Sequence, residues 1–233
     1  MKSFNELNIK KEIINGLISQ DIKIPTKVQE IAIPKILDNK DLIVNSQTGS
    51  GKTLSFLIPS FERINKEKRE TQVIILAPTH ELVMQINNEI KKLSASSSEN
   101  VTSLALIGEV NINKQIKHIK NIKPHIIVGT CGRVLDLIKQ RKLKVHTVKT
   151  IILDEIDSLL KKDNTQRVKD IVKSTLRERQ VIGFSASIND EIISLCSDIM
   201  KEFEIIKLDD NKVNPNINHY YIHCDRRDKF TNL

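Results

Sequence analysis

Short apolar runs alternate along most of the chain with segments whose apolar residues recur at helical spacing. The runs Asp41–Asn45 and Gln72–Ala77 are apolar over nearly their whole length. Continuous apolar runs of this length are typical of strands that are buried on both faces of a sheet. We expect further strands at residues 101–106, 125–128, 150–153, 180–184 and 204–207, and helices at residues 54–58, 81–93, 112–119, 133–139, 166–176 and 190–200.

This alternation predicts the fold class, an α/β protein in which a parallel sheet carries helices on both faces. Ligands of such sheets bind beyond the carboxyl ends of the strands. Ahead of the first strand, two stretches of helical spacing flank Pro25, which predicts two short helices. Pro25 can start the second of these helices, and the Thr26 hydroxyl can cap it. Residues 94–100 are rich in serine and predict a polar loop.

The pattern divides the chain into four parts. Residues 1–40 form a helical region that packs on the first domain, residues 41–209 form that domain, and residues 210–216 are a polar linker that contains a proline. Residues 217–233 have the pattern of one strand and the start of a helix, which together cannot bury a core. We therefore expect a second domain that is missing from this chain.

Composition limits the classes of protein to which the chain can belong. A chain of 233 residues buries enough surface to fold without disulfides, and its three cysteines are scattered and odd in number. This cysteine usage fits a reducing compartment. No apolar run is long enough to span a bilayer, and the N-terminus lacks a signal-peptide pattern. We expect a cytoplasmic monomer that does not bind membranes.

The chain carries a formal net charge of +8, from 37 Lys and Arg against 29 Asp and Glu. This excess favours polyanion partners, although a lysine-rich surface that only keeps the protein soluble explains it equally well. Trp is absent and aromatic residues make up 3% of the chain, which argues against a nucleic-acid site built on base stacking. Contacts from Arg, Lys and main-chain N–H groups to a nucleic-acid backbone are the remaining mode.

A glycine-rich turn follows the first predicted strand and leads into a helix. Gly49 and Gly51 let the backbone approach phosphate oxygens, and the start of the helix offers unpaired N–H groups. Lys52 adds a positive charge for the outer phosphates of a nucleotide, and the Thr53 hydroxyl can ligate Mg²⁺. A lysine-bearing surface turn is the alternative interpretation. The predicted nucleotide-binding residues here are Ser46, Gln47, Thr48, Gly49, Ser50, Gly51, Lys52 and Thr53.

Acidic residues follow directly on the strand predicted at residues 150–153. Carboxylates at the carboxyl end of a strand can face the glycine-rich turn across a shared site. We assign Asp154 to Mg²⁺, partly through water, and Glu155 to the polarisation of the attacking water, so that Lys52, Asp154 and Glu155 are the predicted catalytic residues. The alternative is a helix N-terminus at which the acids only complement the macrodipole.

The order of these motifs resembles the first RecA-like domain of a DEAD-box RNA helicase over nearly the whole chain. The stretch Asp154–Asp157 is similar to the acidic motif of that family, and Ile22–Gln29 resembles its adenine-reading Q motif. Residues 124–137 look most like the bacterial members. The other stretches that match in order are Ser46–Thr53, Pro78–Leu82, Thr130–Arg133 and Ser185–Ser187.

The resemblance implies a P-loop NTPase that uses ATP and Mg²⁺ and remodels short RNA duplexes, as family members do in ribosome assembly or in the cold. Phe4, Ile22, Thr26 and Gln29 would then contact the nucleotide, and the Gln29 amide can pair with the N6 and N7 edge of adenine. Asp157, Ser185 and Ser187 would couple the nucleotide state to RNA. The residues that would hold the RNA backbone, without reading its sequence, are Pro78, Thr79, His80, Gly108, Thr130, Gly132 and Arg133.

Several positions depart from the pattern of the family. Ile22 stands where an aromatic ring would stack on adenine, so that stacking worth about 1 kcal/mol is lost. His80 replaces an arginine, and Glu109 replaces a glycine and brings negative charge towards the RNA. The remaining departures are Cys131 for proline, Ile156 for alanine and Ser187 for threonine.

Three functions fit these residues. The first is an RNA-dependent ATPase and helicase of which this chain holds the ATP-binding half. Because the second domain would supply arginine fingers worth about 10³–10⁵ in rate, we expect the chain alone to be nearly inactive. The second is a non-catalytic RNA-binding or regulatory fragment, suggested by the missing second domain and by His80 and Glu109. The third is another P-loop machine such as a DNA helicase, which the Q motif argues against.

Overall fold

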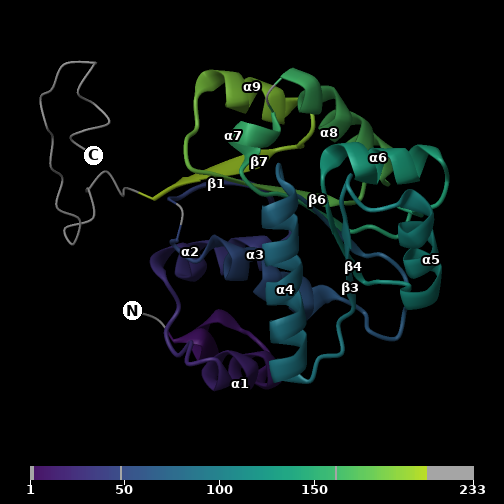
Figure 1. Ribbon diagram of the computed structural model, residues 1–233. Helices are drawn as coiled ribbons and strands as arrows, with labels where there is room; N and C mark the ends of the chain where they lie inside the picture. Colours follow the sequence, from purple (N-terminus) through teal and green to yellow (C-terminus); the bar gives the residue numbers. More distant parts are fainter. Residues whose placement is uncertain (1–2, 48, 161, 209–233) are drawn as a thin grey trace, which may run out of the picture.

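The computed structural model describes residues 3–47, 49–160 and 162–208 (Figure 1). Within this part of the chain, one sheet contains seven strands, all parallel, in the order β3-β4-β2-β5-β6-β1-β7. The predicted linker, the predicted start of a second domain and Thr48 lie outside the described residues. The strands are β1 (Asp41–Asn45), β2 (Val73–Leu76), β3 (Ser103–Leu106), β4 (Ile126–Gly129), β5 (Thr150–Leu153), β6 (Gln180–Ser185) and β7 (Phe203–Lys207).

Helices cover both faces of the sheet, so the predicted fold class is confirmed (Figure 1). Neighbouring residues of a strand point to opposite faces. Leu42 and Val44 of β1 accordingly belong to a core with α1 to α4, whereas Ile43 belongs to a second core with α6 to α9. The helices are α1 (Lys11–Ser19), α2 (Lys27–Leu37), α3 (Lys52–Arg63), α4 (His80–Ser97), α5 (Ile112–Ile122), α6 (Cys131–Lys139), α7 (Ile156–Leu159), α8 (Lys162–Ser174) and α9 (Asp190–Ser197).

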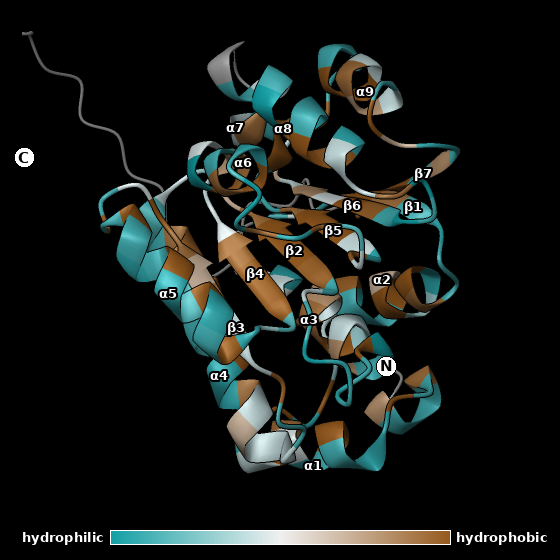
Figure 2. Ribbon diagram, turned by 90° about the vertical axis from the view of Figure 1, so that its right-hand side faces the viewer, coloured by the Kyte–Doolittle hydropathy of each residue, from teal (hydrophilic) through white to brown (hydrophobic). Residues whose placement is uncertain are grey.

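The strands are brown over most of their length when coloured by hydropathy, whereas the helices turn teal faces to solvent (Figure 2). The four residues of β2, and the four of β5, are all buried. Burial on both faces explains why these strands are continuously apolar and do not alternate. No helix in residues 3–47, 49–160 and 162–208 is long and apolar enough to cross a membrane.

Helix α4 is longer than the sequence predicts. The predicted loop at residues 94–100 is therefore wrong over residues 94–97, which are helical. Helix α4 continues to Ser97, and Ser98 ends it with φ +55° in the left-handed region. Gly16 of α1 packs so closely against this last turn that a β-carbon on it would lie 2.8 Å from the Ser97 backbone nitrogen. Packing against α1 therefore extends a helix that its serines do not favour.

The two short helices predicted before the first strand are confirmed as α1 and α2. Pro25 does not start the second one, because α2 begins at Lys27 with Thr26 as its N-cap. Gln29 lies at the third position of α2, and its Oε1 accepts a hydrogen bond of 3.0 Å from the Thr26 N–H, as in a capping box. A short 3-10 helix, η1 (Phe4–Leu7), precedes α1 and was not predicted.

Candidate functional site

Most predicted site residues follow the carboxyl ends of the strands, along one edge of the sheet; the exceptions are Phe4, Ile22, Thr26 and Gln29, which precede β1. The strand order divides this edge into two halves. One half, formed by β5, β6 and β1, carries Asp154, Ser185 and the glycine-rich turn. The other half, formed by β3, β4 and β2, carries the three segments that were assigned to RNA. The boundary between the halves runs between β2 and β5, which are hydrogen-bonded neighbours.

The glycine-rich turn has the backbone that a phosphate-binding loop needs. Gly49 and Gly51 have φ angles of +79° and +93°, in the region that favours glycine. Gly51 is the N-cap of α3, which begins at Lys52. The Ser50 hydroxyl donates to the Gln47 carbonyl at 2.8 Å and closes the turn. The free N–H groups at the start of a helix and these two glycines favour an anion at this point.

Two buried polar atoms in this turn lack a hydrogen-bond partner among the described residues. They are Nζ of Lys52, whose residue is 9% exposed, and Oγ of Ser46, which is 2% exposed. Leaving a buried donor unpaired costs about 1–3 kcal/mol, and more for a charged group. A phosphate oxygen would supply the partner that both atoms lack, so this turn fits a nucleotide. The alternative of a lysine-bearing surface turn does not fit a buried ammonium group.

Asp154 lies within electrostatic reach of Lys52, although β6 separates the strands that precede them. Burial raises the pKa of Asp154 to about 6, while the Lys52 charge acts in the opposite direction. Asp154 is 4% exposed, and its Oδ1 accepts from the Glu155 N–H at 3.0 Å. A carboxylate whose charge is destabilised by burial gains most from a divalent cation.

Glu155 adopts φ +50°, which is uncommon for a residue with a side chain, and it is half-buried as the N-cap of α7. Such strained backbone is concentrated at functional sites. In residues 3–47, 49–160 and 162–208, no three His, Cys, Asp or Glu side chains gather as a metal site. A cation held by Thr53 and Asp154 would therefore need further oxygen ligands from phosphate or water.

The Q motif contacts the glycine-rich turn directly. Gln29 is 2% exposed, and its Nε2 donates to the Gly51 carbonyl at 3.1 Å. Its Oε1 holds the Thr26 N–H, so both ends of the amide already have a partner in the protein. Each end can make one more bond, and the pairing of Gln29 with adenine stays a prediction. Ile22 is half-buried, whereas Phe4 is 2% exposed in the core and presents no face to a base.

The predicted coupling residues form a chain of hydrogen bonds between the glycine-rich turn and the acidic segment that follows β5. The Ser46 N–H donates to the Ser185 carbonyl at 2.9 Å, and the Ser185 hydroxyl donates to the Ser187 carbonyl at 2.6 Å. The Ser187 hydroxyl then donates to Oδ2 of Asp157 at 3.3 Å. Three hydrogen bonds thus connect the glycine-rich turn with the acidic segment, while the coupling role of these residues stays a prediction.

The residues assigned to RNA come together from three neighbouring strands. Pro78, Thr79 and His80 follow β2, Thr130, Gly132 and Arg133 follow β4, and Gly108 follows β3. Thr79 is exposed and caps α4, since its Oγ1 accepts from the Leu82 N–H at 3.2 Å. Thr130 is the N-cap of α6. The half-edge they form is a polar surface of helix starts and turns, as backbone contacts to nucleic acid require.

Arg133 is engaged within the protein. Its guanidinium donates to the carbonyls of Gly108 and Val110 and to Oε1 of Gln115, each at 2.7 Å. This geometry favours a positioning role for Arg133, while its predicted contact with RNA stays a prediction. Gln115 is 2% exposed and was missed, because in sequence it is one polar residue of a lysine-rich helix.

His80 and Glu109, two departures from the family pattern, contact each other. His80 Nε2 accepts from the Gly108 N–H at 3.3 Å, so Nδ1 carries the hydrogen and donates to Oε1 of Glu109 at 3.1 Å. His80 lacks the permanent charge of an arginine, and the Glu109 carboxylate adds negative charge to this surface. The change from the family pattern therefore lowers the positive potential where RNA would lie.

Comparison with known proteins identifies relatives of this arrangement. The family model described as DEAD/DEAH box helicase matches residues 26–195. The Bacillus subtilis protein named "Probable ATP-dependent RNA helicase YfmL" is 46% identical over 206 residues, which cover 88% of this chain and 54% of that protein. The DEAD-box ATP-dependent RNA helicase CshC of Bacillus cereus is 41% identical over 204 residues, 88% of this chain and 52% of that one. The chain thus spans about half the length of the curated relatives it matches.

Solved structures give the same result. A DEAD box protein from the hyperthermophile Methanococcus jannaschii superimposes with a TM-score of 0.84 at 34% identity and covers 99% of this chain and 61% of its own. Dbp5 of Saccharomyces cerevisiae, solved with RNA and ADP BeF3, has a TM-score of 0.79 at 28% identity over 89% of this chain and 52% of its own. These neighbours support the fold class predicted from the motifs, a RecA-like domain.

Proposed function

The chain belongs to the DEAD/DEAH box helicase family, and from this membership we propose that it is the ATP-binding domain of an RNA-dependent ATPase that unwinds short RNA duplexes. One observation carries the proposal. A buried ammonium group, Lys52 Nζ, has no hydrogen-bond partner among the described residues and lies within electrostatic reach of Asp154, whose pKa burial raises. Such a pair is stabilised when a phosphate meets the lysine and a cation meets the carboxylate.

The residues of this chain would divide the work as follows. ATP with Mg²⁺ supplies the phosphoryl group that is transferred to water. Lys52 and the N–H groups at the start of α3 bind and orient the phosphates. Thr53 and Asp154 would hold Mg²⁺, partly through water, and Glu155 would polarise the attacking water. Gln29 selects adenine and ties that choice to the backbone of the turn at Gly51.

RNA would bind along the other half of the same edge, through backbone contacts that carry no base sequence. A second RecA-like domain would close on both halves and supply the arginines that stabilise the transition state, a contribution of about 10³–10⁵ in rate. The hydrogen-bonded path from Ser46 to Asp157 lies within the nucleotide half, and it supports coupling between the glycine-rich turn and the acidic segment. A monomeric state, a cytoplasmic location and a role in ribosome assembly or in the cold stay predictions.

The test is to titrate the chain with a fluorescent ATP analogue and Mg²⁺, and to measure phosphate release with and without RNA. We expect saturable binding, very slow release, and a loss of affinity of about 10-fold to 100-fold in Lys52→Ala, because a charged hydrogen bond is worth about 1.5–3 kcal/mol. GTP should compete poorly. Fast phosphate release that RNA does not change would contradict the proposal.

A non-catalytic RNA-binding fragment is the second candidate, and the contact between Glu109 and His80 bears on it. Although these two departures suggested the second function in the sequence, a carboxylate beside the predicted RNA residues opposes RNA binding and so does not favour a protein that only binds RNA. If the chain binds RNA but no ATP analogue in the presence of Mg²⁺, this second function replaces the first.

A further inference from the structure

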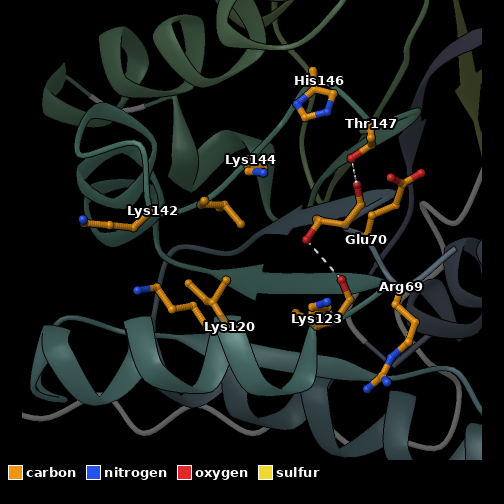
Figure 3. Close-up of a pocket in the computed structure, with 12 residues that line it drawn as sticks. Arg69, Glu70, Lys120, Lys123, Lys142, Lys144, His146 and Thr147 are labelled. Atoms are coloured by element: carbon orange, nitrogen blue, oxygen red, sulfur yellow. Dashed lines mark hydrogen bonds between the residues drawn. The ribbon is translucent and has the colours of Figure 1, made fainter.

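A groove lined by basic residues lies at the amino ends of the central strands, at the sheet edge opposite the candidate nucleotide site (Figure 3). Its volume is about 550 Å³. It opens between the connecting segments that enter β2, β4 and β5, three neighbouring strands of the sheet. We call it the amino-edge groove. Its basic residues are Arg69, Lys120, Lys123, Lys142, Lys144 and His146.

The cationic side chains flank this groove on two sides. Figure 3 shows Lys120 of α5 and Lys123, which directly follows α5, on one side, and Lys142 and Lys144 on the other. These four lysines and Arg69 are exposed. None of the five has an ion pair or a side-chain hydrogen bond within residues 3–47, 49–160 and 162–208. Their charges are therefore free to meet an anion from outside.

At the base of the groove, two threonine hydroxyl groups donate hydrogen bonds to backbone carbonyls. Thr71 Oγ1 donates to the Pro124 carbonyl at 3.1 Å, and Thr147 Oγ1 donates to the Thr71 carbonyl at 2.8 Å. These two bonds tie together the three segments that form the groove. Buried Leu143 makes the base partly apolar.

The concentration of charge exceeds what composition explains. Five of the twelve lining residues are Lys or Arg, against 37 of 233 in the whole chain, so fixed cations are more than twice as frequent here. Glu70 is the one acidic residue of the lining. Five positive charges around one groove repel each other, and a surface that only needs to stay soluble would spread them or pair them.

The lining also restricts the kind of anion. It contains no Phe, Tyr or Trp on which a base could stack. Lysines are flexible point charges that meet phosphates in any order, unlike a site built for one bidentate anion. Two flanking rows of them match a run of regularly spaced phosphates better than a single compact ion.

We propose that the amino-edge groove is a second RNA site, which holds the sugar-phosphate backbone without ATP and without sequence preference. This inference rests on the proposed function. An RNA long enough to reach both edges of the sheet would bind through both sites at once, so that the groove keeps the substrate attached while the carboxyl edge releases its strand.

The test compares two double variants of the chain that change its net charge equally. Lys142→Glu/Lys144→Glu removes two groove cations from a connecting segment, and Lys11→Glu/Lys40→Glu removes two exposed lysines outside the groove. Binding of a long single-stranded RNA without nucleotide is measured by fluorescence anisotropy over a range of salt concentrations. Each lost phosphate contact lowers the slope of log affinity against log salt by about 0.7.

We expect the groove variant to lose about 1.4 from this slope, and so to bind roughly 25-fold more weakly at 0.1 M salt than the wild type. The control variant should change far less, and both variants should bind the ATP analogue as the wild type does. In the wild type, RNA should also protect Lys120, Lys123, Lys142 and Lys144 from acetylation. This measurement uses no variant, so it does not depend on whether a variant folds.

Two results overturn the inference. If wild-type chain binds RNA and the groove and control variants are equally affected, the groove is no RNA site although the proposed function stands. If tripolyphosphate protects the four lysines and RNA does not, the groove takes small polyphosphates instead. A wild-type chain that binds no RNA at all contradicts the proposed function itself, so the two failures are distinguishable.

Discussion

Replacing Asp154 by asparagine should make the nucleotide-free chain more stable at neutral pH, although it removes a predicted catalytic group. Burial raises the pKa of Asp154 from 3.8 to about 6. The folded state therefore binds a proton more tightly than the unfolded state, and wild-type stability falls as pH rises from about 4 to 6. Above pH 6 the ionised carboxylate stays unfavourable. A shift of about two pKa units corresponds to about 3 kcal/mol, which a neutral side chain avoids.

Urea unfolding of wild type and Asp154→Asn, followed by circular dichroism without nucleotide, measures this difference. We expect Asp154→Asn to be more stable by up to about 3 kcal/mol at pH 7.5, and by about half as much at pH 5, where wild-type Asp154 is mostly protonated. At pH 7.5 this corresponds to a gain of roughly 6–12 °C in melting temperature for a domain of this size.

The matched control is Asp136→Asn, at an exposed position of α6. It should change the free energy of unfolding by less than about 0.5 kcal/mol at either pH. If Asp154→Asn destabilises the chain at pH 7.5, or if its gain is the same at both pH values, then burial does not dominate the energetics of Asp154. In either case the inference that a cation relieves this carboxylate fails.

Three further changes test the packing around the site. Gly16→Ala should lower stability by about 1–3 kcal/mol in urea unfolding, because its β-carbon would lie 2.8 Å from a backbone nitrogen of α4. Gly51→Ala should cost about 1–3 kcal/mol and weaken binding of the ATP analogue, since it sets a side chain at φ +93° and 2.6 Å from Gln29 Nε2. Gln115→Ala removes one of the three acceptors of Arg133 and the side-chain donor to the Ile107 carbonyl, so it should cost about 1–3 kcal/mol and weaken RNA binding in anisotropy titrations, with ATP affinity unchanged.

A glycine with free space around it serves as the control for these changes. A β-carbon on Gly132 would meet only Arg167 Nη1, at 3.9 Å. Gly132→Ala should therefore leave stability unchanged or slightly higher, because alanine favours the helix α6. If it destabilises the chain as much as Gly16→Ala does, close packing is not the cause. A Gln115→Ala variant with unchanged RNA affinity would show that the Arg133 contacts do not shape the RNA half of the edge.

The strands and most helices could be predicted because their signals are local. Val73–Leu76 and Thr150–Leu153 are apolar throughout, and the structure shows each of them buried on both faces. Helix ends were less predictable where a distant contact decides them. The last turn of α4, at Ser97, forms against Gly16, which lies 81 residues earlier in the chain. Serine alone gives no sign of that contact.

The candidate site was predictable as far as its motifs are contiguous in sequence. The sequence alone does not give the strand order, in which β6 lies between β5 and β1 and still leaves Asp154 within reach of Lys52. Gln115 could not be found from the sequence either, because its role depends on a contact that only the folded chain makes. Its importance comes from Arg133, 18 residues later, whose guanidinium turns inward to the 108–110 loop.

Because the seven strands of the described sheet run the same way, each connection leaves a strand at the carboxyl end of the sheet and enters the next strand at the amino end. The glycine-rich turn and the acidic segment each leave a strand at the carboxyl end, whereas each segment of the amino-edge groove enters a strand at the amino end. Substitutions in the amino-edge groove can therefore change the surface charge at one end of the domain without altering the residues predicted for ATP hydrolysis at the other end.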